Sequence, residues 1–177
     1  MTKFNPLPSL DELNDLLDYD PETGLFTWKK SRRGPRASTS SIAGCLHSTG
    51  YVYIAIKSKI YLAHRLAYKM YHGSDPVDMI DHIDMDRANN CIANLRDATY
   101  TQNGRNSKSK KNSFSGVKGV QPNRYSAIST STASPWKAQI RVNKKSIHLG
   151  CYKTKEEAVL AYEKAAKEYF GDFARTE

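Results

Sequence analysis

Four polar residues in the middle of the chain have side chains suited to hydrolysing a phosphodiester bond. Asp81 and His82 are adjacent, Asn94 follows His82 by 12 positions, and Asn103 follows Asn94 by 9. A histidine with an ordinary pKa near ~6.5 accepts a proton from water at neutral pH. Asp81 and Asn103 offer the carboxylate and carboxamide oxygens that suit Mg²⁺. Because phosphodiester cleavage needs an activated water and a neutralised phosphate, these residues indicate metal-assisted hydrolysis.

The stretch 79–106 contains these residues and resembles the HNH nuclease motif over 28 positions. In that family, two strands and a helix hold one divalent metal ion. The resemblance implies that His82 is the general base and that Asn94 orients its imidazole. It also implies that Asp81 and Asn103 bind one Mg²⁺ ion, or another divalent cation such as Mn²⁺, in each active site.

The same stretch has a plainer interpretation. Aspartate and asparagine favour turns because they bond nearby backbone, so the loop after His82 could be only a capped turn. A calcium-binding EF-hand loop is excluded, because Asp84 and Asp86 are not followed by the required glycine and closing glutamate. Successive residues of a strand point to opposite faces, so Asp81 and His82 converge on one phosphate only if the chain bends locally.

The composition favours an intracellular protein that binds nucleic acid. The chain has 177 residues, of which 39% are hydrophobic and 25% charged, as in ordinary soluble proteins. Its net charge of +9 attracts polyanions, and no stretch approaches the roughly 20 apolar residues that span a membrane. The N-terminus also lacks the apolar core of a signal peptide. We therefore expect double-stranded DNA as the partner, with no membrane and no small-molecule substrate.

The three cysteines are isolated from one another along the chain. No Cys-x-x-Cys pair occurs, so the sequence predicts no zinc knuckle. We expect buried or half-buried thiols in a reducing compartment.

The residues before the motif predict the elements that position it. Ser9 and Glu12 form a capping box, and leucines line one face of the helix that follows. An Asp-Pro-Glu-Thr-Gly turn separates this helix from a short strand. The expected helices cover about residues 10–17 and 64–71, and the expected strands cover residues 25–28, 50–57 and 60–63. The polar loop 29–40 carries five positive charges. It is either a solvated surface loop or a loop that contacts phosphate.

His64 and Arg65 belong to a Tyr-Leu-Ala-His-Arg-Leu-Ala-Tyr segment upstream of the motif. This segment resembles the His-Arg-Leu segment found before many phage HNH motifs. The resemblance makes both residues possible auxiliaries of the site. Because most histidines outside a metal constellation are structural, we expect His64 to pack and to bond on the phosphate side rather than to catalyse.

A second module follows the motif. Residues 107–115 are poor in hydrophobic residues and rich in Lys, Asn and Ser, which is typical of a flexible linker. Alternating hydrophobic residues then predict strands at 116–120, 136–142 and 146–150. A second capping box, Thr154 with Glu157, begins a helix whose alanine face can lie close on a sheet, and Gly171 ends it.

The pattern G-V, W-x-A-x-I and H-L-G-x-Y-x-T-x-E-E-A-x-x-A-Y covers about 60 residues and resembles the ethylene-response-factor (Apetala-type) DNA-binding domain. In that family the outward sheet face enters the major groove. The residues that the resemblance places at base or phosphate contacts are Lys118, Gln139, Arg141, Ser146 and His148, and Lys137 shares their face. Arg141 suits guanine and Gln139 suits adenine. The basic residues near the linker that we expect along the DNA backbone are Arg105, Lys108, Lys110 and Lys111.

Together these patterns predict an α+β protein. An N-terminal strand and helix region leads into a ββα-metal HNH motif, followed by a three-stranded antiparallel sheet packed on one helix. The expected parts are a nuclease module at 1–106 with its core motif at 60–106, a basic flexible linker at 107–115, and the DNA-binding domain at 116–177.

The predicted function is a metal-dependent DNA endonuclease that nicks DNA or cuts both strands at a site positioned by its C-terminal domain. The resemblance implies a homing-type enzyme of a phage or mobile element, and a phage-borne enzyme is expected to act in the cytoplasm of a bacterial host. One alternative is a non-catalytic DNA-binding protein or regulator on an inactive HNH scaffold. Another is an RNA-binding module, which fits less well because Trp136 is expected to face inward rather than to stack on bases.

Overall fold

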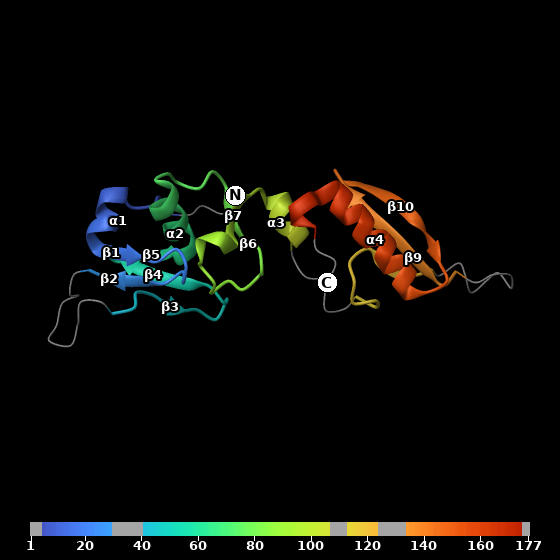
Figure 1. Cartoon of the computed structure of the whole chain (residues 1–177), viewed down its shortest axis with the longest axis horizontal. Coiled ribbons are helices and arrows are strands. Elements are labelled where there is room, and N and C mark those ends of the chain that lie inside the picture. Colours follow the sequence, from blue (N-terminus) through green and yellow to red (C-terminus); the bar gives the residue numbers. More distant parts are fainter. Residues whose placement is uncertain (1–4, 30–40, 107–112, 124–133, 175–177) are drawn as a thin grey trace. The chain divides into compact units, whose positions relative to one another are not determined.

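The computed structural model describes residues 5–29, 41–106, 113–123 and 134–174 (Figure 1). The chain divides into two compact units, Met1–Tyr100 and Thr101–Glu177. Helices and strands occur in both units, which confirms the predicted α+β class. Most of the charged loop 29–40 and of the linker lies outside the described residues. No helix among the described residues is long and apolar enough to cross a bilayer.

The described part of the first unit contains short antiparallel strands, in sheets of two or three, and two α-helices. Strand β1 pairs with β2, β3 pairs with β4 and β4 with β5, and β6 pairs with β7. The elements in chain order are α1 (Leu10–Leu16), β1 (Leu17–Tyr19), β2 (Phe26–Trp28), β3 (Cys45–Leu46), β4 (Val52–Ile56), β5 (Lys59–Leu62), α2 (Ala63–His72), β6 (Met79–His82), a 3-10 turn (Ile92–Asn94) and β7 (Leu95–Ala98).

The elements predicted before the motif are confirmed, with ends moved by one or two residues. The Ser9 side chain accepts a hydrogen bond from the Glu12 N–H at 3.2 Å and begins α1 as expected. Lys57 and Ser58 both have positive φ, which is typical of a two-residue hairpin turn between strands such as β4 and β5. Strands β1 and β3 were not predicted, because three and two residues are too few to show an alternating pattern.

The strand pair of the motif is part of the hydrophobic core of the first unit. Ile80 of β6 and Leu95 of β7 are 6% and 7% exposed and lie in one cluster with residues of α1, β2 and α2. Leu13, Phe26 and Leu66 are among these partners. The N-terminal region therefore supports the motif directly rather than forming a separate domain.

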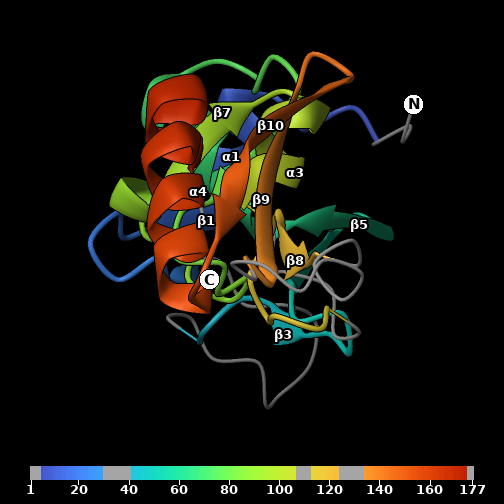
Figure 2. The ribbon, with the colours of Figure 1, turned by 90° about the vertical axis from the view of Figure 1, so that its right-hand side faces the viewer.

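The second unit is a three-stranded antiparallel sheet with helix α4 on one face (Figure 2). Its elements are α3 (Tyr100–Asn106), β8 (Val120–Pro122), β9 (Trp136–Val142), β10 (Lys145–Tyr152), α4 (Lys155–Phe170) and a 3-10 turn (Gly171–Phe173). Ala138 and Ile140 of β9 are buried together with Ala158, Tyr162 and Ala165 of α4. This arrangement confirms the predicted sheet on one helix. The predicted limits 1–106, 107–115 and 116–177 stay predictions, and α3 belongs almost entirely to the second unit.

The first strand of this sheet differs from the prediction. We expected a strand at 116–120, but β8 begins only at Val120. Gly116 and Gly119 have φ values of +73° and +68°, which are incompatible with an extended strand. The Ser115 hydroxyl donates to the carbonyl oxygens of Val117 and Val120 at 2.9 and 2.6 Å, and so stabilises a turn in this segment.

A bulge in β10 changes which residues face outward. Ile147 pairs with Ile140 and His148 with Gln139, but the next pair is Gly150 with Ala138. The extra residue, Leu149, shifts the alternation by one position. Cys151 consequently lies opposite Lys137 and is exposed, as is Cys45, whereas Cys91 is half-buried. The expectation of buried or half-buried thiols was therefore wrong for two of the three cysteines.

Replacing Gly119 by alanine should destabilise the second unit more than replacing Gly116. Both positions carry similar positive φ, so each substitution costs about 1 kcal/mol of backbone strain. A Cβ at Gly119 would also lie 2.2 Å from the Gln139 oxygen and 2.3 Å from the Tyr162 ring, whereas a Cβ at Gly116 meets nothing within 4 Å. We expect a total loss of roughly 3 kcal/mol for Gly119→Ala, measured by urea denaturation. Equal losses for both variants would contradict the close packing at Gly119.

Candidate active site

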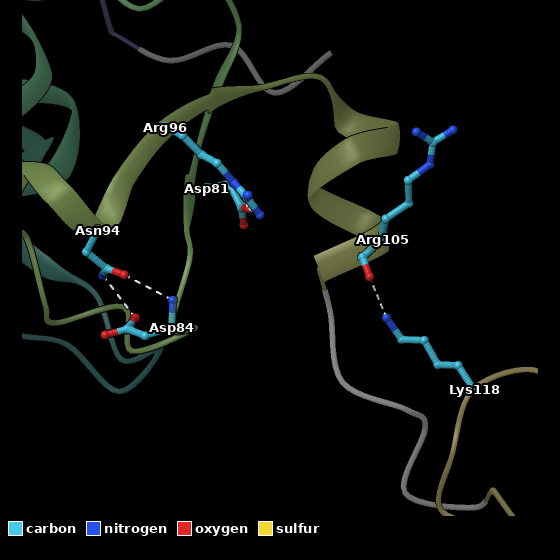
Figure 3. A network of polar contacts seen from close by, with 6 residues as sticks. All are labelled: Asp81, Asp84, Asn94, Arg96, Arg105 and Lys118. Carbon is cyan, nitrogen blue, oxygen red and sulfur yellow. Dashed lines mark hydrogen bonds and ion pairs between the residues drawn. The ribbon is translucent and has the colours of Figure 1, made fainter. Parts of the chain in front are cut away.

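The strand pair β6–β7 presents the acidic residue of the motif to an arginine. Asp81 lies directly opposite Arg96 in the antiparallel register. Nε and Nη2 of Arg96 donate to Oδ2 of Asp81 at 3.0 and 2.8 Å (Figure 3). The Asp81 side chain is 4% exposed and that of Arg96 is 17% exposed. The carboxylate therefore has a cationic partner in a largely buried ion pair.

His82 is the last residue of β6 and contacts a different set of side chains. Its ring centroid lies 5.0 Å from that of His64 and 5.9 Å from that of Tyr51. Burial lowers the pKa of His82 below its ordinary value, although a contact with Asn90 and three nearby aspartates act in the opposite direction. The imidazole is therefore neutral at neutral pH, which is the state of a general base.

His64 lies in the first turn of α2 and packs edge to face against His82, with an angle of 84° between the ring planes. It is 5% exposed. Burial, and then the charges of His82 and Arg65, lower the pKa of His64 to about 3. Nη1 of Arg65 donates to the Asp78 carbonyl at 2.9 Å and ties α2 to the segment before β6. His64 is thus a neutral packing residue, and auxiliary roles for His64 and Arg65 stay predictions.

Asn94 fixes the loop that follows His82. Its Oδ1 accepts from the Asp84 N–H at 3.0 Å, and its Nδ2 donates to Asp84 Oδ1 and to the Asn89 carbonyl, both at 2.9 Å (Figure 3). Burial alone would raise the pKa of Asp84, but hydrogen bonds from Asn89, the Asp86 backbone and Asn94 outweigh it and hold the pKa below its ordinary value. Asn94 therefore shapes the loop backbone, and a direct bond from Asn94 to the imidazole stays a prediction.

The predicted metal ligands have suitable oxygen atoms. Asp81 is held by Arg96 in the first unit, and Asn103 is half-buried on α3 in the second. Within the described ranges, no three His, Cys, Asp or Glu side chains are grouped so that they could hold a metal ion. A carboxylate, a carboxamide, water and substrate phosphate form a donor set that Mg²⁺ accepts. The residue types fit a hard divalent cation, and their assignment as its ligands stays a prediction.

The sheet face opposite α4 carries five of the ten residues predicted to contact DNA. The register of β9 and β10 places Arg141 opposite Ser146 and Gln139 opposite His148. Each of these residues is exposed or half-exposed, as is Lys137 on the same face. The register thus places hydrogen-bond donors and acceptors on neighbouring positions of two adjacent strands.

Two of the predicted DNA contacts also have partners inside the second unit. Nζ of Lys118 donates to the Arg105 carbonyl at 2.7 Å (Figure 3). The Arg105 guanidinium lies 4.4 Å from the centre of the Phe170 ring. These contacts fasten α3 to the second unit. Lys108, Lys110 and Lys111 lie outside the described residues. All of these DNA contacts stay predictions.

Three residues at the candidate site or on the sheet face were not predicted from the sequence. Arg96 follows the Asn-Leu pair of the motif, but its pairing with Asp81 depends on a hairpin register that spans 15 positions. Asn90 was read only as part of a polar loop. Cys151 reaches the outward face only through the bulge at Leu149, which no alternation pattern shows.

Comparison with known proteins identifies the segment that contains the site. Residues 61–105 match the HNH endonuclease family. A curated relative from Acanthamoeba polyphaga mimivirus, named as an uncharacterized HNH endonuclease, is 34% identical over 113 residues. That match covers 63% of this chain and 54% of the relative, so the chain spans about half the relative's length. The chain therefore carries an HNH endonuclease domain, whereas the likeness of the second unit to the ethylene-response-factor domain stays a prediction.

The Asp81–Arg96 pair should behave as a buried ion pair when one or both of its partners are replaced. Arg96→Leu leaves a buried carboxylate without its cation, and we expect it to lower the free energy of unfolding by about 3 kcal/mol. The double variant Asp81→Leu/Arg96→Leu should recover most of this loss, because no unpaired charge remains. Urea denaturation measures both effects.

The matched control is Lys69→Leu, which removes a cation whose side chain is 12% exposed from a pair whose carboxylate, Asp75, is 56% exposed and stays hydrated. We expect less than about 1 kcal/mol from this loss. Similar losses for Arg96→Leu and Lys69→Leu would show that burial does not strengthen the first pair.

Proposed function

We propose that this chain is a metal-dependent endonuclease that hydrolyses phosphodiester bonds in double-stranded DNA. His82 carries the proposal. It is a buried histidine with a lowered pKa, it occupies the place of the general base in the motif, and it lies within the residues that match the HNH endonuclease family. A neutral imidazole held away from bulk water can accept a proton from an attacking water molecule. The net charge of +9 supports a polyanionic substrate.

The other motif residues have distinct roles in this proposal. Asp81 and Asn103 would hold one divalent cation, Mg²⁺ or a similar ion, and a cation so bound neutralises charge on the scissile phosphate. Asn94 holds the loop after His82 through the Asp84 backbone and carboxylate. One such site in each chain would permit one strand cut per binding event, so a monomer would nick.

In the proposal the second unit positions the nuclease on its target. The support comes from the face formed by Lys137, Gln139, Arg141, Ser146 and His148, which combines basic and amide side chains on adjacent strands. A rigid strand can hold the planar guanidinium of Arg141 at the position of a base edge in the major groove. Phosphate contacts from Lys and Arg residues elsewhere would add affinity without sequence preference.

A second candidate function is a non-catalytic DNA-binding protein on the same scaffold. The observation that favours it is the Arg96–Asp81 ion pair, because a carboxylate held by a guanidinium is a weaker metal ligand than a free one. Both functions predict DNA binding, but only the endonuclease converts plasmid DNA in the presence of a divalent metal.

Replacing His82 should abolish cleavage while leaving DNA binding in place. His82→Ala removes the general base, and we expect the nicking rate to fall by at least ~10²-fold. The assay follows supercoiled plasmid with Mg²⁺ at low salt and scores nicked and linear forms on a gel. His72→Ala, which removes an exposed histidine at the end of α2, is the control and should cut normally. Wild-type protein that binds DNA but never cuts it with Mg²⁺ or Mn²⁺ would favour the non-catalytic candidate.

Replacing Arg141 should change sequence preference and not only affinity. A bidentate contact from Arg141 to guanine predicts a loss of about 1–3 kcal/mol on the preferred site and relaxed choice at one base position. Lys164→Ala removes the same charge from an exposed position of α4, on the other side of the sheet, and should leave the preference intact. Sequencing of DNA selected by each variant compares the two. If Arg141→Ala lowered the affinity equally for every DNA sequence, the sheet face would bind DNA through its charge alone.

A further inference from the structure

The imidazole of His82 needs a hydrogen-bonding partner that fixes its orientation, and the amide of Asn94 is used elsewhere. Both N–H bonds of its Nδ2 go to Asp84 and to the Asn89 carbonyl, and its Oδ1 accepts from the Asp84 backbone. Asn94 therefore sets the course of the loop. A second side chain next to His82 is therefore a candidate for orienting the ring itself.

Asn90 has the required side chain. It is 3% exposed, and its Nδ2 donates to the Ala88 carbonyl at 3.0 Å. Among the described residues, no donor reaches the buried Oδ1 of Asn90 with full hydrogen-bond geometry. The Asn90 side chain lies within hydrogen-bonding reach of the His82 ring. A buried carbonyl oxygen without a donor is costly, so an N–H of the neighbouring imidazole is its natural partner.

The backbone around Asn90 is held by the turn between β1 and β2, far away in sequence. The Tyr19 hydroxyl donates to the Asn90 carbonyl at 2.8 Å across 71 positions. On the other side of the turn, the Ile92 N–H donates to the Pro21 carbonyl at 2.9 Å, and the Cys91 thiol donates to the Glu22 carbonyl at 2.9 Å. Three consecutive residues of the loop are thus bonded to the last residue of β1 or to the turn that follows it.

Gly24 allows this turn to approach the loop closely. A Cβ added at Gly24 would lie 2.4 Å from the carbonyl carbon of Asn90 and 2.4 Å from the nitrogen of Cys91. The atoms that this Cβ would meet are backbone atoms, so no flexible side chain could move aside to make room for it. The turn therefore fixes the Asn90 peptide by contact as well as by hydrogen bonds.

We infer that Asn90 is the positioning residue for the His82 imidazole, and that the β1–β2 turn holds Asn90 in place through Tyr19 and Gly24. The inference rests on the proposed function, because it concerns the orientation of the proposed general base. It assigns to the N-terminal hairpin a role in the chemistry of a site that begins 60 positions later along the chain.

The first test replaces Asn90 by leucine, which keeps a similar volume and removes both polar atoms. We expect kcat for nicking to fall about 10-fold, the effect of one hydrogen bond on the base, with KM unchanged. Long-range ¹H–¹⁵N spectra of the histidine rings give a second readout that needs no DNA. The His82 signals, identified by their loss in His82→Ala, should move from one fixed tautomer toward an exchanging mixture, while those of exposed His72 stay in place.

Tyr19→Phe is the second variant, and it tests the positioning role of Asn90 if Asn90→Leu does not fold. It removes only the hydroxyl that bonds the Asn90 carbonyl, and we expect the His82 signals to move in the same direction by a smaller amount. Gly24→Ala should move them too. Its matched control, Gly73→Ala, carries the same positive φ with nothing within 4 Å of the added Cβ, and should leave them unchanged.

Unchanged His82 ring signals in folded Asn90→Leu, or in Tyr19→Phe when Asn90→Leu does not fold, would overturn the inference. Wild-type protein that fails to cut DNA, with ring signals that still respond to these variants, would overturn the proposed function and leave the positioning role of Asn90 standing.

Discussion

The site depends on the packing of one small strand pair against a core made by the N-terminal half of the chain. A two-stranded hairpin alone is at best marginally stable in water. Strands β6 and β7 gain their stability because Ile80 and Leu95 are buried with residues of α1, β2 and α2. This packing places the following residues, Asp81 and His82, in an environment from which water is largely excluded.

Exclusion of water acts on the two motif residues in opposite ways. A histidine can be buried in its neutral form, so desolvation lowers the pKa of His82 and leaves an imidazole able to accept a proton. Burying a carboxylate is costly unless a cation and hydrogen bonds compensate its charge, and Arg96 supplies both to Asp81. In the proposed function the Asp81 carboxylate also binds a metal ion, so Arg96 and the metal ion compete for this carboxylate.

The loop after His82 is ordered by polar contacts rather than by apolar packing. Asp84 receives hydrogen bonds from Asn89, Asn94 and the Asp86 backbone, and the N-terminal turn fastens the next part of the loop at Asn90. The capped-turn interpretation and the nuclease interpretation are therefore compatible. The hydrogen bonds of the turn fix the backbone of the loop. This fixed backbone keeps His82 and its neighbours in place.

The sequence by itself determined the local features. Capping residues at Ser9 and Thr154 mark helix starts, alternation marks β9, and the spacing of Asp81, His82 and Asn94 marks the HNH segment later matched at residues 61–105. These features follow from short-range geometry, which repeats with a fixed period along the chain. Only the tertiary structure decided which distant residues meet: Arg96 with Asp81, Tyr19 with Asn90, and His64 with His82. Hairpin register, bulges and core packing bring such pairs together, and these depend on the summed burial of many side chains, which no local pattern encodes.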